Sequence, residues 1–215
     1  MPRKNIRSFC GKPLICHSID IALSSPNIEQ VYVSTDDDEI ENISLHSGAS
    51  IIRRPKNLAN DKAPEWLAWQ HAINWVNRNG EVFDRFVSLP ATSPLRNIED
   101  VSACINACIS SVDISISMIE TTRSPWFNMV KKNRNGFLKL LNEGKSLYNR
   151  RQDTPVGYDL TTVAYVAWPK FILESSSIWD GVVKGVLIPQ ERAIDIDTET
   201  DFLIAECLME MKLKK

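Results

Sequence analysis

Short β-branched apolar runs alternate with segments of helical periodicity along most of the chain. The strand-like runs lie at 31–35, 50–53, 86–90, 114–119, 163–167 and 184–188. Between them, apolar residues at helical spacing predict helices at 14–23, at 66–76 and from about Ile98 onward. Strands separated by helices of this length predict a mainly parallel sheet with crossover helices. The pattern therefore indicates an α/β fold, whose functional groups are expected at the carboxyl ends of the strands.

The helix predicted at 66–76 carries large side chains on one stripe. These residues are Trp66, Trp69, Ile73 and Val76. An apolar stripe at this spacing is more typical of a helix packed on a core than of a platform for a cofactor. We therefore expect the stripe to belong to the hydrophobic core.

The alternation breaks at about 123–151, where polar residues and glycine dominate. Within this stretch Asn135-Gly136 is a hairpin turn signal, flanked by apolar residues at 127–130 and 137–141. We predict a small β excursion that leaves the sheet, either to cover the substrate or to reach a second subunit.

Length and composition favour one compact domain over residues 1–215. The chain has a formal net charge of −2 and is 43% hydrophobic, which is ordinary for a globular protein. Near-neutral charge argues against a nucleic-acid partner, which normally requires a basic face. No apolar run reaches the length of a membrane span, and the first residues lack the apolar stretch of a signal peptide. We therefore expect a soluble cytoplasmic protein without a membrane partner.

Two carboxylates near the C-terminus are the strongest candidate for chemistry. Asp195 and Asp197 are separated by one isoleucine and follow an apolar strand-like run. In an extended segment, residues two apart point to the same side, so both carboxylates can converge on one site. Mg²⁺ commonly takes one or two carboxylates together with substrate phosphate oxygens. The alternative is that one of the two aspartates caps the helix that begins near Thr198.

Seven short sequence blocks occur in a characteristic order along the chain. The blocks are Pro2-Arg3-Lys4-Asn5-Ile6, Gly11-Lys12-Pro13-Leu14-Ile15, Val33-Ser34-Thr35-Asp36, Arg54-Pro55, Thr92-Ser93-Pro94-Leu95-Arg96, Arg150-Arg151-Gln152-Asp153 and Asp195-Ile196-Asp197-Thr198. Together they resemble the acylneuraminate cytidylyltransferases, also called CMP-sialic acid synthetases. The resemblance implies a Rossmann-like nucleotidyltransferase, usually a homodimer. Such an enzyme couples CTP to the anomeric hydroxyl of an acidic sugar and releases pyrophosphate.

The resemblance also implies roles for particular residues. By similarity, Asp195 and Asp197 hold Mg²⁺, and Arg151 matches an arginine that the family uses beside the active site. Because charge builds on phosphate oxygens as pyrophosphate leaves, a metal ion and basic groups are needed to neutralise it.

Substrate contacts are implied for Arg3, Lys4, Asn5, Arg54, Ser93, Arg96, Gln152 and Tyr165. Lys4 and Asn5 match the nucleotide-binding pair of the family, and an asparagine offers both a donor and an acceptor to a cytosine edge. Three assignments have alternatives. Arg3 can form a surface salt bridge instead, Arg53 is a less favoured candidate than Arg54, and Pro94 can make the Ser93 loop a purely structural turn.

The chain also departs from the family pattern. Family members usually begin with an apolar strand and a glycine-rich loop before the block at Pro2, and both are missing from the chain as given. We expect a truncated chain in which Met1 is internal, with two neighbouring strands left unpaired.

The sugar half also differs, because Pro90 replaces a glutamine and Asp159 stands where some relatives have an arginine. Three hypotheses therefore stand: a sugar-acid cytidylyltransferase, a nucleotidyltransferase for another small acceptor, and a noncatalytic binding or oligomerisation subunit.

Overall fold

Two groups of strands form the centre of the computed structural model, which describes residues 1–60, 62–143 and 148–213. One group is a parallel pair, β3 (Tyr32–Thr35) and β4 (Ser50–Arg53). The other is a four-stranded sheet in the order β10 (Val183–Leu187), β6 (Ile114–Glu120), β9 (Tyr158–Ala167) and β5 (Phe86–Ser88). The predicted α/β class is confirmed.

Strand directions agree with the predicted mainly parallel arrangement, with one exception in the larger sheet. β10 runs parallel to β6, whereas β9 runs antiparallel to both β6 and β5. The sheet is therefore mixed. A pattern of apolar residues identifies a strand but carries no information on its direction, because the side-chain period is the same in both orientations.

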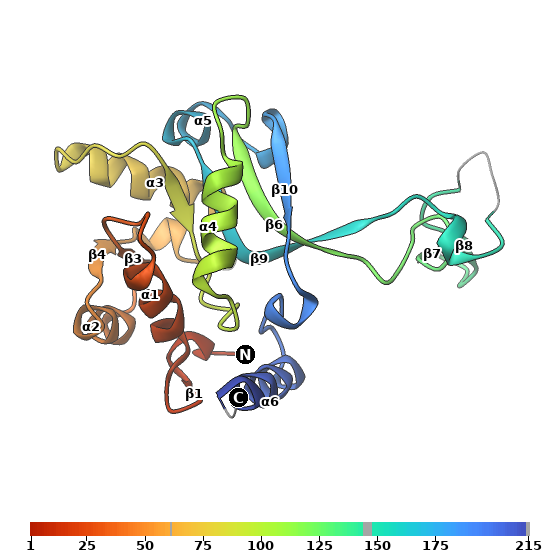
Figure 1. Ribbon diagram of the computed structural model, residues 1–215, viewed down its shortest axis with the longest axis horizontal. Coiled ribbons are helices and arrows are strands. Elements are labelled where there is room, and N and C mark those ends of the chain that lie inside the picture. The colour runs from red at the N-terminus through yellow and green to blue at the C-terminus, as the bar shows by residue number, and fades with distance from the viewer. Residues whose placement is uncertain (61, 144–147, 214–215) are drawn as a thin grey trace.

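The helices lie around these strands (Figure 1). Their bounds are α1 (Leu14–Ser24), α2 (Asp38–His46), α3 (Glu65–Arg78), α4 (Ile98–Ala107), α5 (Pro169–Glu174) and α6 (Glu199–Leu213). Side-chain caps explain where two of these helices, α2 and α4, begin. Asp37 accepts from the backbone N–H of Glu39 and Ile40, and Asn97 and Asp100 form a capping box at α4. None of the helices in the described ranges is long and apolar enough to span a membrane.

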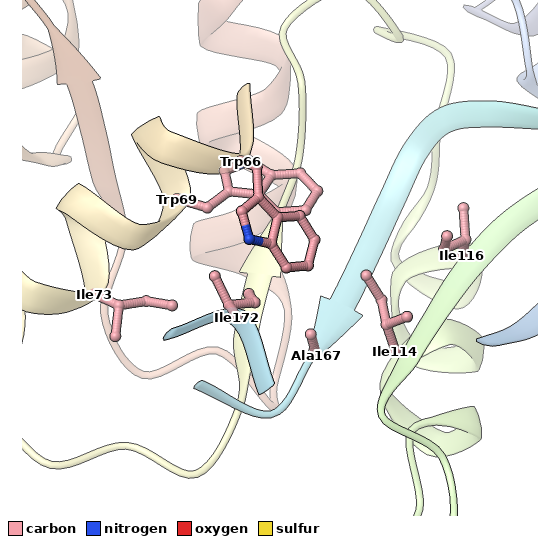
Figure 2. Close-up of a cluster of buried hydrophobic side chains, with 7 residues drawn as sticks. All are labelled: Trp66, Trp69, Ile73, Ile114, Ile116, Ala167 and Ile172. Carbon is pink, nitrogen blue, oxygen red and sulfur yellow. The ribbon is translucent and has the colours of Figure 1, made fainter. Parts of the chain in front are cut away.

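The apolar stripe of α3 packs on the larger sheet, as predicted. Figure 2 shows Trp66, Trp69 and Ile73 of α3 gathered with residues from β6, β9 and α5, namely Ile114, Ile116, Ala167 and Ile172. Val76, the fourth residue of the stripe, is also buried. Burying such side chains is the main favourable contribution to folding.

The predicted β excursion is confirmed as a hairpin that projects away from the body (Figure 1). Its strands are β7 (Val130–Lys132) and β8 (Leu138–Leu140), which pair antiparallel. Gly136 takes a positive φ of 85° in the turn, a conformation that glycine adopts without strain. Part of the predicted excursion, residues 144–147, lies outside the described residues.

A cavity of about 1480 Å³ separates the two groups of strands. β3 contributes Val33 to its wall and β5 contributes Val87, while α1 and α3 contribute Ile19 and Ile73. Among the described residues, β3 and β5 each pair with a neighbouring strand along one edge only. The two sheets are therefore joined by helices and side chains rather than by strand pairing.

Candidate active site

The two candidate metal ligands lie in an extended segment between the last strand and the last helix. Ile196, which separates them, is fully buried, and its backbone N–H donates to the Thr92 carbonyl at 2.9 Å. Asp195 is half-buried and Asp197 is exposed. The burial of Ile196 agrees with the expectation that the isoleucine faces the core, and the convergence of the two carboxylates on one site stays a prediction.

The backbone N–H groups at the start of α6 donate to side chains other than those of Asp195 and Asp197. The carboxylate of Asp201 accepts from the backbone N–H of Thr198 at 2.7 Å and from that of Asp197 at 3.2 Å. The Thr198 hydroxyl in turn accepts from the N–H of Asp201. The alternative that Asp195 or Asp197 provides the helix cap is therefore wrong, because Thr198 and Asp201 fill that role.

The two carboxylates of the aspartate pair lie in different surroundings. Oδ1 of Asp195 is buried without a hydrogen-bond partner in the described part of the chain. Leaving a buried acceptor unpaired is costly unless a ligand or water completes it. Oδ1 of Asp197 already faces a cation, because the Lys4 ammonium lies 2.8 Å away.

Carboxylate oxygens of this kind suit Mg²⁺. The described residues contain no cluster of three or more His, Cys, Asp or Glu side chains that could hold a metal ion. A bound Mg²⁺ would therefore take its remaining ligands from substrate or water.

The predicted nucleotide-binding pair lies beside this segment. Lys4 begins the short 3-10 helix η1 (Lys4–Ile6), and its ammonium also donates to the Ile196 carbonyl at 2.8 Å. Asn5 lines the cavity, and its Oδ1 is buried without a partner among the described residues. The structure thus brings Lys4 into contact with the aspartate segment, and it leaves the Asn5 amide oxygen available to a ligand donor.

Arg3 and Arg53 lie at the surface against carboxylates of α2 and its cap. Arg3, in the left-handed region with φ of 56°, pairs with Asp37 at 3.3 Å, and Arg53 pairs with Glu41 at 2.8 Å. Both arginine side chains are more than half exposed. This geometry gives Arg3 the surface salt bridge that was the alternative to its phosphate contact, and it agrees with the choice of Arg54 over Arg53.

Arg54 turns inward to the cavity wall. Its Nε donates to Ser34 Oγ at 3.1 Å and its Nη2 donates to the Ser34 carbonyl at 2.7 Å. Burial lowers the pKa of Arg54, while the negative charges of Asp36 and Glu65 oppose that shift. Arg54 is therefore a half-buried guanidinium that lines the cavity together with one of these carboxylates, Glu65.

Glu65, at the first position of α3, was missed by the sequence analysis. Glu65 is exposed as a whole residue, but desolvation of its carboxyl group by the surrounding protein raises its pKa, and a hydrogen bond from Trp69 and the charge of Arg54 oppose that shift. The charge of Asp195 raises it further. Tyr165 shares this environment, because burial raises its pKa to about 12 and the charges of Glu65 and Asp195 act in the same direction. Arg54, Glu65, Tyr165 and Asp195 thus form one interacting polar group.

Ser93 and Arg96 make inward contacts that hold their loop. The Ser93 hydroxyl lies 2.6 Å from the Thr162 hydroxyl. The Arg96 guanidinium donates to Ser18 Oγ and to the carbonyls of Pro90 and Thr162. Burial lowers the pKa of Arg96 to about 9, against the effect of neighbouring carboxylates, so it stays charged at neutral pH. With 2% of its surface exposed, Arg96 fastens α1 and β9 to the loop between them.

Arg151 and Gln152 lie elsewhere, at the base of the excursion. Arg151 begins the short 3-10 helix η3 (Arg151–Asp153), and its Nη1 donates to the Thr122 carbonyl at 3.4 Å. Both residues line a smaller pocket of about 220 Å³ together with Arg123. Neither side chain has a contact with the aspartate segment among the hydrogen bonds and ion pairs of the described residues. Within one chain, the structure does not bring Arg151 to Asp195 and Asp197.

Comparison with known proteins identifies the family to which the chain is similar. A sequence profile described as "Cytidylyltransferase" matches residues 1–178. The chain is 31% identical to a pseudaminic acid cytidylyltransferase of Campylobacter jejuni, over 97% of this chain and 90% of that protein. It is 30% identical to a CMP-N,N'-diacetyllegionaminic acid synthase of Legionella pneumophila, over 98% and 91% of the two chains.

Solved structures agree in fold. The structure of a CMP:2-keto-3-deoxy-manno-octonic acid synthetase in complex with CTP superposes with a TM-score of 0.67 at 16% identity. The match covers 99% of this chain and 93% of that one. At this identity the likeness concerns the fold alone.

Proposed function

This chain belongs to the cytidylyltransferase family, and on that premise we propose that it transfers CMP from CTP to a nonulosonic acid and releases pyrophosphate. The observation that carries the proposal is the aspartate segment, where Asp195 has an unpaired buried oxygen and Asp197 faces the Lys4 ammonium. Two carboxylates can hold a divalent cation, and a neighbouring lysine can contact the phosphate groups of a substrate that binds together with this cation.

In the proposed reaction, the anomeric hydroxyl of the sugar loses its proton to solvent and its oxygen bonds to the α-phosphorus of CTP. The bond from that phosphorus to the bridging oxygen of pyrophosphate breaks, and its electron pair leaves with the pyrophosphate. Mg²⁺ held by Asp195 and Asp197 would neutralise charge on the phosphate oxygens. Lys4 supplies further positive charge at the same place, because two hydrogen bonds hold its ammonium against the aspartate segment.

The cavity wall supplies groups for the nucleoside. The unpaired amide oxygen of Asn5 can accept from an amino group of the base. Arg54 presents a half-buried guanidinium in the same cavity, already oriented by Ser34. Preorganised polar groups of this kind bind a ligand with little further loss of conformational entropy.

For the sugar, we propose an acid of the pseudaminic or legionaminic type. Relatives named for these two sugars match along nearly the whole chain. The replacement of the expected glutamine by Pro90 removes an amide from the loop that carries Ser93, so recognition of the sugar must use other groups.

We also propose a homodimer in which the excursion of one copy approaches the site of the other. The hairpin exposes large apolar side chains, with Phe137 69% and Leu138 64% exposed, which is unusual for a projecting segment that remains in solvent. Arg151 at the base of the excursion would then meet substrate bound to the second copy.

The test is magnesium-dependent pyrophosphate release from CTP with a panel of acceptors: pseudaminic acid, legionaminic acid, N-acetylneuraminic acid and an unrelated sugar alcohol phosphate. We expect release only with CTP, a nonulosonic acid and Mg²⁺ together, and a CMP-sugar product of matching mass. Turnover with the sugar alcohol phosphate alone would contradict the proposal, as would the absence of turnover with all four acceptors.

A further inference from the structure

An ion pair between Arg192, whose side chain is 26% exposed, and the buried Asp100 lies just before the aspartate segment. Arg192 ends the short 3-10 helix η5 (Gln190–Arg192), three residues before Asp195. Its Nε donates to Oδ2 of Asp100 at 2.8 Å, and its Nη2 donates to Oδ1 at 2.9 Å. The Asp100 side chain is 3% exposed. Two parallel hydrogen bonds fix both the distance and the orientation of the arginine.

Asp100 is itself held rigidly at the start of α4. Its Oδ2 accepts from the Asn97 backbone N–H at 3.1 Å, and its own N–H donates to the Asn97 side chain at 2.9 Å. The charge of Asp100 also opposes the lowering of the Arg96 pKa by burial. The partner of Arg192 is therefore a carboxylate whose position the helix start determines.

A second anchor holds the other end of the segment. The N–H of Ile196 donates to the Thr92 carbonyl at 2.9 Å, and Thr92 belongs to the loop that leads into α4. Asp195 thus lies between two attachments, at Arg192 and at Ile196, to the same stretch of chain at 92–100. An attachment on each side restricts the carboxylate far more than one would.

We propose that Asp100 and Arg192 are positioning residues that fix the Asp195 carboxylate for phosphate chemistry, acting through the backbone of residues 193 and 194. This inference rests on the proposed function for its purpose, but the attachment itself is a property of the free protein. Burying a carboxylate costs desolvation free energy, and removing either partner of the pair would leave an uncompensated charge. A contact between apolar side chains would hold the segment without this cost.

The experiment compares Arg192→Met, which keeps the aliphatic stem, with Arg192→Lys, which keeps the charge but not the two parallel hydrogen bonds. Asp100→Asn removes the carboxylate charge while keeping an oxygen for the Asn97 N–H. Asp180→Asn is the matched control, because Asp180 forms the capping box of another short helix (Ile178–Asp180) with Ser177, away from the aspartate segment.

The first readout is hydrogen exchange in the metal-free protein. We expect the amides of residues 193–197 to exchange about tenfold faster in Arg192→Met, less so in Arg192→Lys, with β6 and β9 unchanged. The second is a Mn²⁺ titration in the presence of CTP, where we expect affinity to fall about tenfold in Arg192→Met and Asp100→Asn, and to stay unchanged in Asp180→Asn.

The inference is overturned if exchange at 193–197 stays within about twofold of wild type in Arg192→Met while only the melting temperature falls. The pair would then be structural. If Arg192→Met does not fold, the comparison of Arg192→Lys with wild type decides in the same way. Absence of CTP turnover in the wild-type protein would end the proposed function, yet the exchange data would still decide whether the ion pair positions the segment.

Discussion

The Lys4 ammonium donates a 2.8 Å hydrogen bond to Oδ1 of Asp197, joining residues 193 positions apart in the sequence. The lysine side chain is 24% exposed and that of the aspartate 70%. An ion pair this accessible to water contributes little to folding. The pair matters for the proposed site instead, because it places the Lys4 ammonium beside one of the carboxylates that we propose as Mg²⁺ ligands.

Lys4→Met should lower turnover without unfolding the protein. We expect kcat/KM for CTP to fall at least about tenfold, which corresponds to about 1.4 kcal/mol of barrier, because positive charge beside the phosphates is lost. The melting temperature should change little. Initial rates of pyrophosphate release and a thermal melt test both statements. Lys170→Met is the control, since Lys170 forms an ion pair with Glu174 at the surface of α5. Equal losses in the two variants would count against a role for Lys4.

Asp195→Asn and Asp197→Asn should each remove most activity. Asparagine keeps the shape of the side chain but not its charge, so the hold on Mg²⁺ weakens. If turnover at saturating Mg²⁺ stays within about threefold of wild type, less than about 1 kcal/mol of barrier, the pair is not the metal site. Asp180→Asn serves as the control, because Asp180 caps the short helix Ile178–Asp180 and does not line the cavity.

Much of the fold can be predicted from the sequence, because the spacing of apolar residues differs between helices and strands. The stripe of α3 and the hairpin at Gly136 were both predicted and are both present. The direction of β9 was not predictable, since it depends on how the chain returns from the excursion and not on the residues of the strand.

Sequence spacing singles out candidate residues, whereas burial can be seen only in the structure. Asp195 and Asp197 stand out in the sequence by their spacing, and the structure places Lys4 against Asp197. Glu65 was missed because a lone glutamate before an apolar stripe is typical of an ordinary helix start. Arg96 was expected at a substrate, but neighbours in space that are distant in sequence enclose it.

Glu65→Gln should make the protein more stable near neutral pH. Burial raises the pKa of the folded carboxyl, so the unfolded chain loses its proton first as pH rises. The ionised carboxylate therefore costs stability above the folded pKa, and the cost vanishes below the unfolded pKa, where both states are protonated. Urea unfolding at pH 7.5 and at about pH 4 should show a gain for the variant that shrinks at the lower pH. A gain that is equal at both values would point to packing instead.

Ile114→Ala should cost about 2–5 kcal/mol in the free energy of unfolding, because it opens a hole in a fully buried cluster. Ile109→Ala, at a side chain that is 49% exposed, should change it by about 0.5 kcal/mol or less. Urea denaturation of the two variants measures the difference. Similar values would mean that the cluster of Figure 2 is not the principal core.

Replacing Phe137 and Leu138 together by aspartate should dissociate the proposed homodimer. Both side chains are exposed on the hairpin, and charged groups in an apolar interface are costly to desolvate. Sedimentation velocity should show a dimer for wild type and a monomer for the variant. Leu203→Asp is the control, because Leu203 is 62% exposed on α6 and away from the excursion. A wild-type monomer would rule out the dimer directly.

The cavity between β3 and β5 separates the two groups of strands. Arg54 directly follows β4 on one side, whereas Tyr165 belongs to β9 on the other, and in the described ranges no strand of one sheet pairs with a strand of the other. The spacing between these groups is therefore set by side-chain packing, which yields more easily than a hydrogen-bonded ladder. Under the proposed function, a nucleotide that spanned the cavity would contact both walls and would therefore crosslink the two sheets while it is bound.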